Sequence, residues 1–298
     1  MAPSPQSPAL APQAAPMIRF QLREGFALTA ELAGPPDGPR VVLVHGGAQS
    51  RRAWDVGVGL LSRAGYRSVA IDMRGHGDSD WAPDGNYALE HWAEDLRQIV
   101  TLLAQDDPRP IALVGASRGG QSVLLTAVDL PALVSCAVLI DVTPQNDESG
   151  IALIRAFMQR SAQGFDSVRE CADAVADFMK RPRRSNVSGL ARILRQDADG
   201  RWFWRWDPRM ADSRFVRPPS EQILMEEAAR EVGVPVLLVR AGMSELVCAQ
   251  DVEHFRALLP TLEVEEVPGI PHMITGDSNA AFLPAVIAFL RRRHEPIG

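Results

Sequence analysis

The chain of 298 residues has only three cysteines, and none of them forms part of a closely spaced pair. Cys136, Cys171 and Cys248 lie far apart in the sequence. A small, odd number of widely separated cysteines argues against a disulfide scaffold and against a zinc site, and it is typical of proteins in a reducing compartment. We therefore expect a cytoplasmic protein without a bound metal.

The sequence also lacks an excess of positive charge and any long apolar run. Its formal net charge is -6, so no basic stripe indicates nucleic-acid binding. No apolar run approaches the roughly 18 residues of a membrane span. Residues 1–16 are rich in Ala and Pro and lack the basic start and unbroken apolar core of a secretory signal. They predict a disordered tail.

Short apolar runs alternate with segments of helical periodicity along most of the chain. This alternation predicts a mostly parallel, doubly wound α/β sheet. The predicted strands are Ile18–Leu22, Ala27–Ala33, Val41–Val44, Ser68–Ile71, Ile111–Val114, Val134–Ile140, Val234–Val239 and Glu263–Val267. The predicted core helices are Trp54–Ala64, Leu89–Leu103, Gln121–Val128, Asp251–Leu259 and Asn279–Arg292.

The alternation breaks over residues 143–232, where no run has the character of a buried strand. Helices are expected there at Ile151–Arg160, Ser167–Lys180 and Asn186–Arg195. We interpret this region as a mostly helical insertion over the edge of the sheet. Residues 17–142 and 233–298 would then form the core domain.

The segment Gly115–Gly120 reads Gly-Ala-Ser-Arg-Gly-Gly and stands between a predicted strand and a predicted helix. Gly-x-Ser-x-Gly in this context is typical of a nucleophile elbow. The sharp turn requires small residues on both sides, and it places the Ser117 hydroxyl at a helix N-terminus, where negative charge is favoured. Ser117 is therefore the candidate nucleophile.

A serine nucleophile needs a base, and the chain has six histidines. His272 directly follows the last predicted strand and is the best placed of them. His76 lies in a glycine loop, where a structural role is expected, and His294 lies in the charged C-terminal segment. Ser117 and Asp141 both follow predicted parallel strands, at the edge where such sheets bind ligands.

The base in turn needs a carboxylate to orient it, and two candidates remain open. Glu245 follows the strand Val234–Val239 and gives the chain order serine, acid, histidine that is typical of this arrangement. Asp141 follows the preceding core strand and could reach the same imidazole. We favour Glu245, with Asp141 as the alternative.

Further residues are candidates for the oxyanion hole and for substrate contact. The backbone amide of Arg118, with that of Gly47 or Ala48, could stabilise an oxyanion. Arg118 and Arg51 could bind an anionic substrate or simply form ion pairs. Indoles recur on one face of an extended segment, and they either line an apolar pocket or bury the insertion: Trp202, Trp204 and Trp206.

Four segments together resemble the α/β-hydrolase family, with similarity from Ile18 to the C-terminus. They are His45–Gly47, Asp72–Ser79, Gly115–Gly120 and Gly269–Met273. The resemblance implies a nucleophile at Ser117, a base at His272, an acid at Glu245 and a helical cap over residues 143–232. Two departures stand out: Glu245 where Asp is commoner, and Pro271 where Gly usually precedes the histidine.

Taken together, these features predict a cofactor-free serine hydrolase that cleaves a small carboxylic ester or lactone through an acyl-enzyme. Dehalogenases and epoxide hydrolases of the family have Asp where this chain has Ser117. A carbon–carbon hydrolase of meta-cleavage products and a cofactor-free peroxidase-like enzyme remain as alternatives, as does a small-molecule receptor with weak hydrolysis. The sequence indicates neither the substrate nor the oligomeric state.

Overall fold

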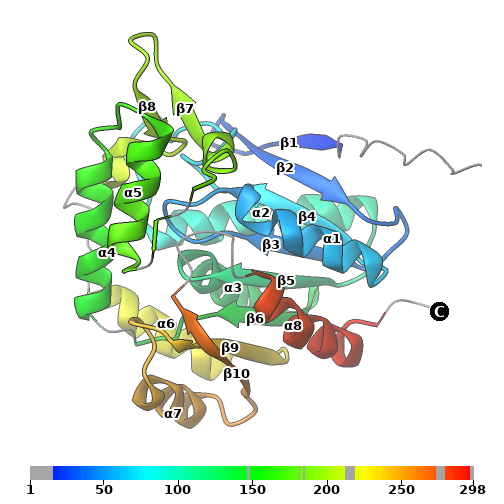
Figure 1. Ribbon diagram of the computed structural model, residues 1–298. Coiled ribbons are helices and arrows are strands. Elements are labelled where there is room, and N and C mark those ends of the chain that lie inside the picture. Colours follow the sequence, from blue (N-terminus) through cyan, green and yellow to red (C-terminus); the bar gives the residue numbers. More distant parts are fainter. Residues whose placement is uncertain are drawn as a thin grey trace, which may run out of the picture.

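The computed structural model describes residues 16–145, 148–180, 182–183, 185–211, 219–272 and 279–295. The predicted N-terminal tail lies outside this set apart from Pro16. Eight strands form the central sheet in the spatial order β1-β2-β4-β3-β5-β6-β9-β10 (Figure 1). Their bounds are β1 Met17–Gln21, β2 Ala27–Ala33, β3 Arg40–Val44, β4 Arg67–Asp72, β5 Ile111–Ala116, β6 Val134–Ile140, β9 Val236–Met243 and β10 Glu263–Pro271.

The sheet is parallel from β4 to β10, and only β1 and β2 pair antiparallel with their neighbours. Every residue of β3 and β5 is buried, which is the condition that produces unbroken apolar strands in parallel sheets. The doubly wound sheet predicted from the sequence is confirmed.

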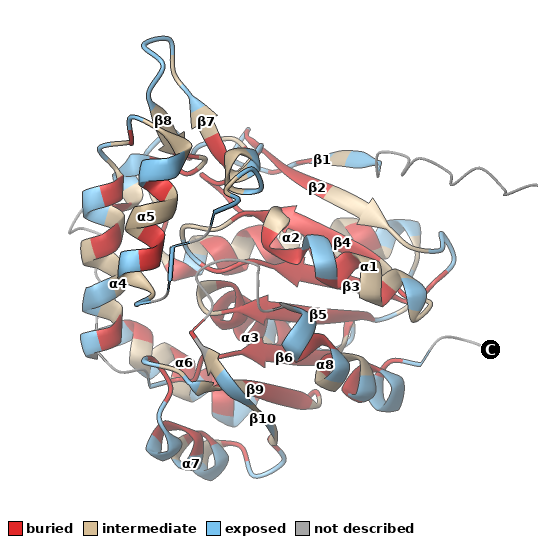
Figure 2. Ribbon diagram, in the orientation of Figure 1, coloured by how far each residue is buried: buried red, intermediate tan, exposed pale blue. Residues whose placement is uncertain are grey.

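Helices cover both faces of the sheet, because alternate strand residues point to opposite sides. Val41 and Leu43 pack in one cluster with helices α1 and α8, whereas Val42 and Val44 pack in another with α2, α3, α6 and α7. Figure 2 shows the buried strands between these layers. The helices are α1 Asp55–Arg63, α2 Leu89–Asp106, α3 Arg118–Asp129, α6 Pro219–Glu231, α7 Ala249–Leu258 and α8 Asn279–Arg293.

A third, smaller apolar cluster belongs to elements that lie over the carboxyl ends of the strands (Figure 1). It is built by α4 Glu148–Ser161, α5 Val168–Phe178 and a two-stranded hairpin of β7 Leu194–Gln196 and β8 Trp202–Trp204. We call these four elements the cap elements. The helix predicted at Asn186–Arg195 is wrong, because only a short 3-10 turn, Leu190–Ile193, precedes β7.

Helix α6 falls within the predicted insertion but packs with the core. Met225, Ala228 and Ala229 belong to the same buried cluster as α2 and α3. The division of the chain at residues 143 and 232 therefore stays a prediction. In the described part of the chain, no helix combines the length and the apolar character needed to cross a membrane.

His294, placed in a charged terminal segment by the sequence, is buried against the core. Its Nε2 bonds to the carbonyl oxygen of Arg40 at 3.0 Å, and its Nδ1 lies 2.8 Å from the Ser135 hydroxyl. These partners fit a neutral ring that donates from Nε2 and accepts at Nδ1. Burial lowers the pKa of His294 to about 4.

This buried histidine makes the fold sensitive to acid. Between about pH 7 and about pH 5 an unfolded chain binds a proton at this position, with an ordinary pKa of about 6.5, while the folded chain does not. Stability is therefore present above the unfolded pKa and is lost as the pH falls. The free energy of unfolding therefore falls between about pH 7 and about pH 5. We expect His294→Gln to make this fall smaller by about 1 to 2 kcal/mol, measured by urea unfolding at several pH values. An unchanged slope in His294→Gln would contradict the assignment.

Candidate active site

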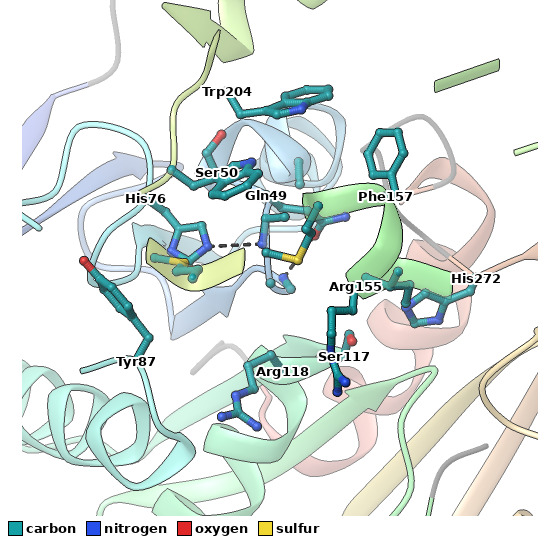
Figure 3. A pocket seen from close by; sticks show the side chains of 18 of the residues that line it. Gln49, Ser50, His76, Tyr87, Ser117, Arg118, Arg155, Phe157, Trp204 and His272 are labelled. Atoms are coloured by element: carbon teal, nitrogen blue, oxygen red, sulfur yellow. Dashed lines mark hydrogen bonds between the residues drawn. The ribbon is translucent and has the colours of Figure 1, made fainter. Parts of the chain in front are cut away.

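A cavity of about 280 Å³ lies between the strand ends and the cap elements. Its floor includes Gly47, Ser117 and His272, which come from loops after β3, β5 and β10. Figure 3 shows Ser117 and His272 on the same side of this space, with Phe157 and Trp204 from the cap elements above them. The sequence prediction that strand ends gather the site residues is confirmed.

Ser117 sits in a strained turn between β5 and α3, with φ of 48° and ψ of -121°. A Cβ on Gly115 would lie 2.4 Å from the Gly119 carbonyl oxygen, and one on Gly119 would lie 2.4 Å from the His45 carbonyl oxygen. These close approaches leave no room for a side chain at either position, which explains the two glycines of the motif. The turn has the geometry of a nucleophile elbow.

The His272 ring is held by Asp141, which directly follows β6. Nδ1 of His272 lies 2.5 Å from Oδ2 of Asp141, and both side chains are buried. The same carboxylate accepts hydrogen bonds from the Ala241 amide at 3.0 Å and from the Ser244 hydroxyl at 2.7 Å. Two donors therefore fix the carboxylate, and the carboxylate fixes the imidazole.

The preference for Glu245 as the orienting acid is wrong in this structure. Glu245 is exposed, and its Oε2 accepts a long hydrogen bond of 3.4 Å from the backbone amide of His272, not from the ring. The strands β6 and β9 are neighbours, so their ends offer two carboxylates close to one histidine. Asp141 reaches the ring because its backbone has a φ of 51° at the strand end and its oxygens meet fixed donors.

The Nε2 atom of His272 has no hydrogen-bond partner among the described residues, and no hydrogen bond joins it to the Ser117 Oγ. Both residues line the cavity, so Nε2 is the ring atom that remains for proton transfer. Hydrogen bonds between a nucleophile and its base are often long without substrate and tighten when it binds.

Two backbone amides near Ser117 are free to stabilise negative charge. In the described part of the chain, no acceptor bonds to the amides of Gly47 and Arg118. The amide of Ala48 is not available in the same way, because it donates to Nε2 of His76 at 3.1 Å. Of the two residues considered from the sequence as partners of Arg118, Gly47 is the one that fits, and Ala48 lines the cavity.

His76 and His45 form a buried, uncharged pair behind this loop. Burial lowers the pKa of His45 to about 4, and burial together with His45 lowers that of His76 to about 3. Each ring bonds to a carbonyl oxygen through Nδ1 and accepts an amide hydrogen at Nε2. The structural role expected for His76 is confirmed, and its effect is to hold the loop after β3.

Two arginines considered for substrate binding form ion pairs instead. Arg51 is buried, bonds to Asp72 and Asp78, and does not line the cavity, so its prediction as a substrate contact is wrong. Arg118 lines the cavity, but its guanidinium pairs with the buried carboxylate of Glu221. The alternative of an ion pair, open for both from the sequence, is the one observed.

The tryptophan segment combines both of the roles considered for it. Trp204 and Trp206 line the cavity and are also buried in the apolar cluster of the cap elements. Trp202 is only partly buried and does not line the cavity, so its predicted contact with substrate is wrong. Strand β8 has ended before Trp206, which instead bridges to His76.

Sequence reasoning missed the contribution of α4 to the cavity. Ile151, Ile154, Arg155 and Met158 all line it. They recur at spacings of three and four residues, so they share one face of the helix. The helix itself was predicted, and this spacing was the signal that could have identified its inner face.

The chain is similar to known proteins over most of its length. The profile described as the alpha/beta hydrolase fold matches residues 39–277. The chain belongs to the α/β-hydrolase family. The predicted α/β-hydrolase fold is confirmed, and relatives that are esterases and other hydrolases indicate a hydrolase.

Two relatives illustrate the similarity. An esterase of Mycobacterium tuberculosis is 30% identical over 86% of this chain and 84% of its own length. A 2-(acetamidomethylene)succinate hydrolase of Mesorhizobium japonicum is 26% identical over 88% of this chain and 92% of its own. A crystal structure of E-2-(acetamidomethylene)succinate hydrolase superposes with a TM-score of 0.76 at 24% identity, covering 92% of this chain and 99% of that chain. Within the described residues, no group of three or more His, Cys, Asp or Glu is arranged to hold a metal ion.

The two carboxylates near His272 can be separated by substitution. We expect Asp141→Asn to lower kcat for an activated ester by roughly 10³-fold. The neutral amide neither holds the imidazole in the tautomer with hydrogen on Nδ1 nor stabilises the imidazolium that forms. Glu245→Gln should change kcat by less than about fivefold, because its side chain only meets the backbone amide of His272. A larger loss in Glu245→Gln than in Asp141→Asn would contradict the assignment.

Arg51 and its neighbour Arg52 offer a matched test of the buried ion pair. Arg51→Met leaves the buried Asp72 carboxylate without its guanidinium, and removing one partner of a buried pair costs about 3–5 kcal/mol of unfolding free energy. Arg52 pairs with Glu31 and Asp55 near the surface, so Arg52→Met should cost about 1 kcal/mol or less. Chemical unfolding of both variants measures the difference, and equal losses would refute it.

Proposed function

We propose that the protein is a serine hydrolase that cleaves a small carboxylic ester or lactone through an acyl-enzyme. The observation that carries this proposal is the convergence of Ser117, at its elbow, with the His272–Asp141 pair in one cavity. A hydroxyl at a helix N-terminus, an imidazole with a free Nε2 and a fixed carboxylate are the parts that acyl transfer requires.

In the proposed reaction, Ser117 Oγ attacks the substrate carbonyl while Nε2 of His272 takes its proton. Asp141 holds the ring in the tautomer with hydrogen on Nδ1 and stabilises the imidazolium that forms. The amides of Gly47 and Arg118 receive the oxyanion of the tetrahedral intermediate. His272 then protonates the leaving alkoxide, and water, deprotonated by the same imidazole, releases the acid.

The cavity supports a small substrate with apolar portions. Its volume of about 280 Å³ is close to the lower end for small-molecule sites. Phe157, Trp204 and Trp206 contribute apolar surface on the cap side. The Mycobacterium tuberculosis relative is named an esterase, which supports the same class of bond.

A panel of 4-nitrophenyl esters of increasing acyl length, with simple lactones beside them, tests this proposal. We expect the highest kcat/KM for short acyl chains and a steep fall for long ones, because a long chain exceeds the cavity. Ser117→Ala should lower kcat by several orders of magnitude, as for other nucleophile deletions.

Three outcomes would contradict the proposal. Wild-type rates in Ser117→Ala would exclude the nucleophile. Faster cleavage of a meta-cleavage dienoate than of any ester would favour the carbon–carbon hydrolase. Turnover below about one per minute for every substrate would favour a receptor, since enzymes commonly turn over far faster.

A further inference from the structure

Four arginines line the cavity, and three of them are neutralised by carboxylates. Arg52 pairs with Glu31 and Asp55, and Arg118 pairs with Glu221. Arg205 pairs with Asp78 at 2.8 Å. These three guanidinium groups are therefore paired with carboxylates of the protein and add little net charge to the cavity.

Arg155 differs from the other three. No hydrogen bond or ion pair joins its side chain to any described residue, although it lines the cavity and is half-buried. In Figure 3 its side chain extends from α4 toward Ser117. A cation is thus held beside the candidate nucleophile without a counter-ion from the described part of the chain.

The surroundings of Arg155 favour an anionic ligand. Ile151, Ile154 and Met158 line the cavity from the same side of α4 as Arg155, and Phe157 lines it two residues further along, so the Arg155 side chain leaves the helix among apolar side chains. A charge in such a setting interacts more strongly with an opposite charge than it would in water. A guanidinium also offers paired N–H donors that match the two oxygens of a carboxylate.

We propose that Arg155 binds a carboxylate that the substrate carries in addition to the bond that is cleaved. The substrate class is therefore a small ester or lactone of a dicarboxylic or otherwise acidic compound. This inference rests on the proposed function and narrows it. The extra carboxylate lies on the α4 side of the scissile carbonyl, because Arg155 reaches the cavity from that helix.

The assignment of Arg155 also explains why Arg118, nearer in sequence to the nucleophile, does not serve this purpose. The Glu221 carboxylate that pairs with Arg118 is buried and would repel a second anion at that position. Arg155 is in contact with no such carboxylate among the described residues.

A matched pair of substrates tests the inference. 4-Nitrophenyl butyrate is neutral beyond its ester, and the 4-nitrophenyl hemiester of succinic acid has the same four-carbon acyl chain with a terminal carboxylate. The readout is the ratio of kcat/KM for the charged ester to that for the neutral ester. It is measured for the wild type and for Arg155→Gln, Arg155→Lys and Arg160→Gln.

We expect the wild type to prefer the charged ester, and Arg155→Gln to lower the ratio by about 10- to 100-fold, mainly through KM. Arg155→Lys should retain an intermediate ratio, since the charge remains without the paired donors. Arg160, an exposed residue at the end of the same helix, lies outside the cavity, so Arg160→Gln should keep the wild-type ratio.

An unchanged ratio in Arg155→Gln, or a wild type that favours the neutral ester, would overturn the inference while leaving the serine mechanism intact. Ser117→Ala, measured on the neutral ester alone, tests the mechanism separately. Loss of the charged-ester preference in Arg160→Gln as well would assign it to the general charge of α4 and would also overturn the role of Arg155.

Discussion

The hydrogen bond between Asp141 and His272 joins residues 131 positions apart, and the arrangement of the candidate site depends on it. Asp141 directly follows β6 and His272 directly follows β10, while the strand between them, β9, supplies the Ala241 amide that fixes the carboxylate. The pairing of three parallel strands therefore sets the position of one imidazole. A register shift in any of them would flip side chains to the other face and separate the two groups.

The opposite side of the site is set by uncharged histidines. His45 and His76 are buried with their rings 4.8 Å apart, and each uses both nitrogens to hold backbone groups. Because the Ala48 amide is bound by His76, the loop after β3 is held in one conformation and presents the Gly47 amide to the cavity. A charged ring could not accept this amide hydrogen, so the loop keeps this hydrogen bond only while His76 is neutral, as its low pKa ensures.

Local patterns in the sequence predicted the strands of the central sheet, most of its helices, and the candidate residues Ser117 and His272, but not the β7–β8 hairpin or α6. Apolar runs located the strands, and the glycines around Ser117 identified a turn that a side chain would block. The orienting acid was not predictable in this way, because Glu245 and Asp141 both follow strands whose ends lie side by side. Only the three-dimensional contacts at these strand ends determine which carboxylate bonds to the His272 ring. The predictions that Arg51 and Trp202 contact substrate were wrong for the same reason. An arginine or an indole in a suitable segment can point toward the cavity or away from it, and tertiary contacts determine its direction.

The charges around the cavity follow from the cost of desolvation. A guanidinium taken out of water needs an acceptor nearby, and Arg52, Arg118 and Arg205 have theirs within the protein. Arg155, among the apolar cavity-lining residues of α4, obtains none from the described residues. In the inference drawn above, the missing acceptor is a carboxylate of the substrate. With Arg155 in the proposed role, the ion pair that selects an acidic substrate also orients it relative to Ser117.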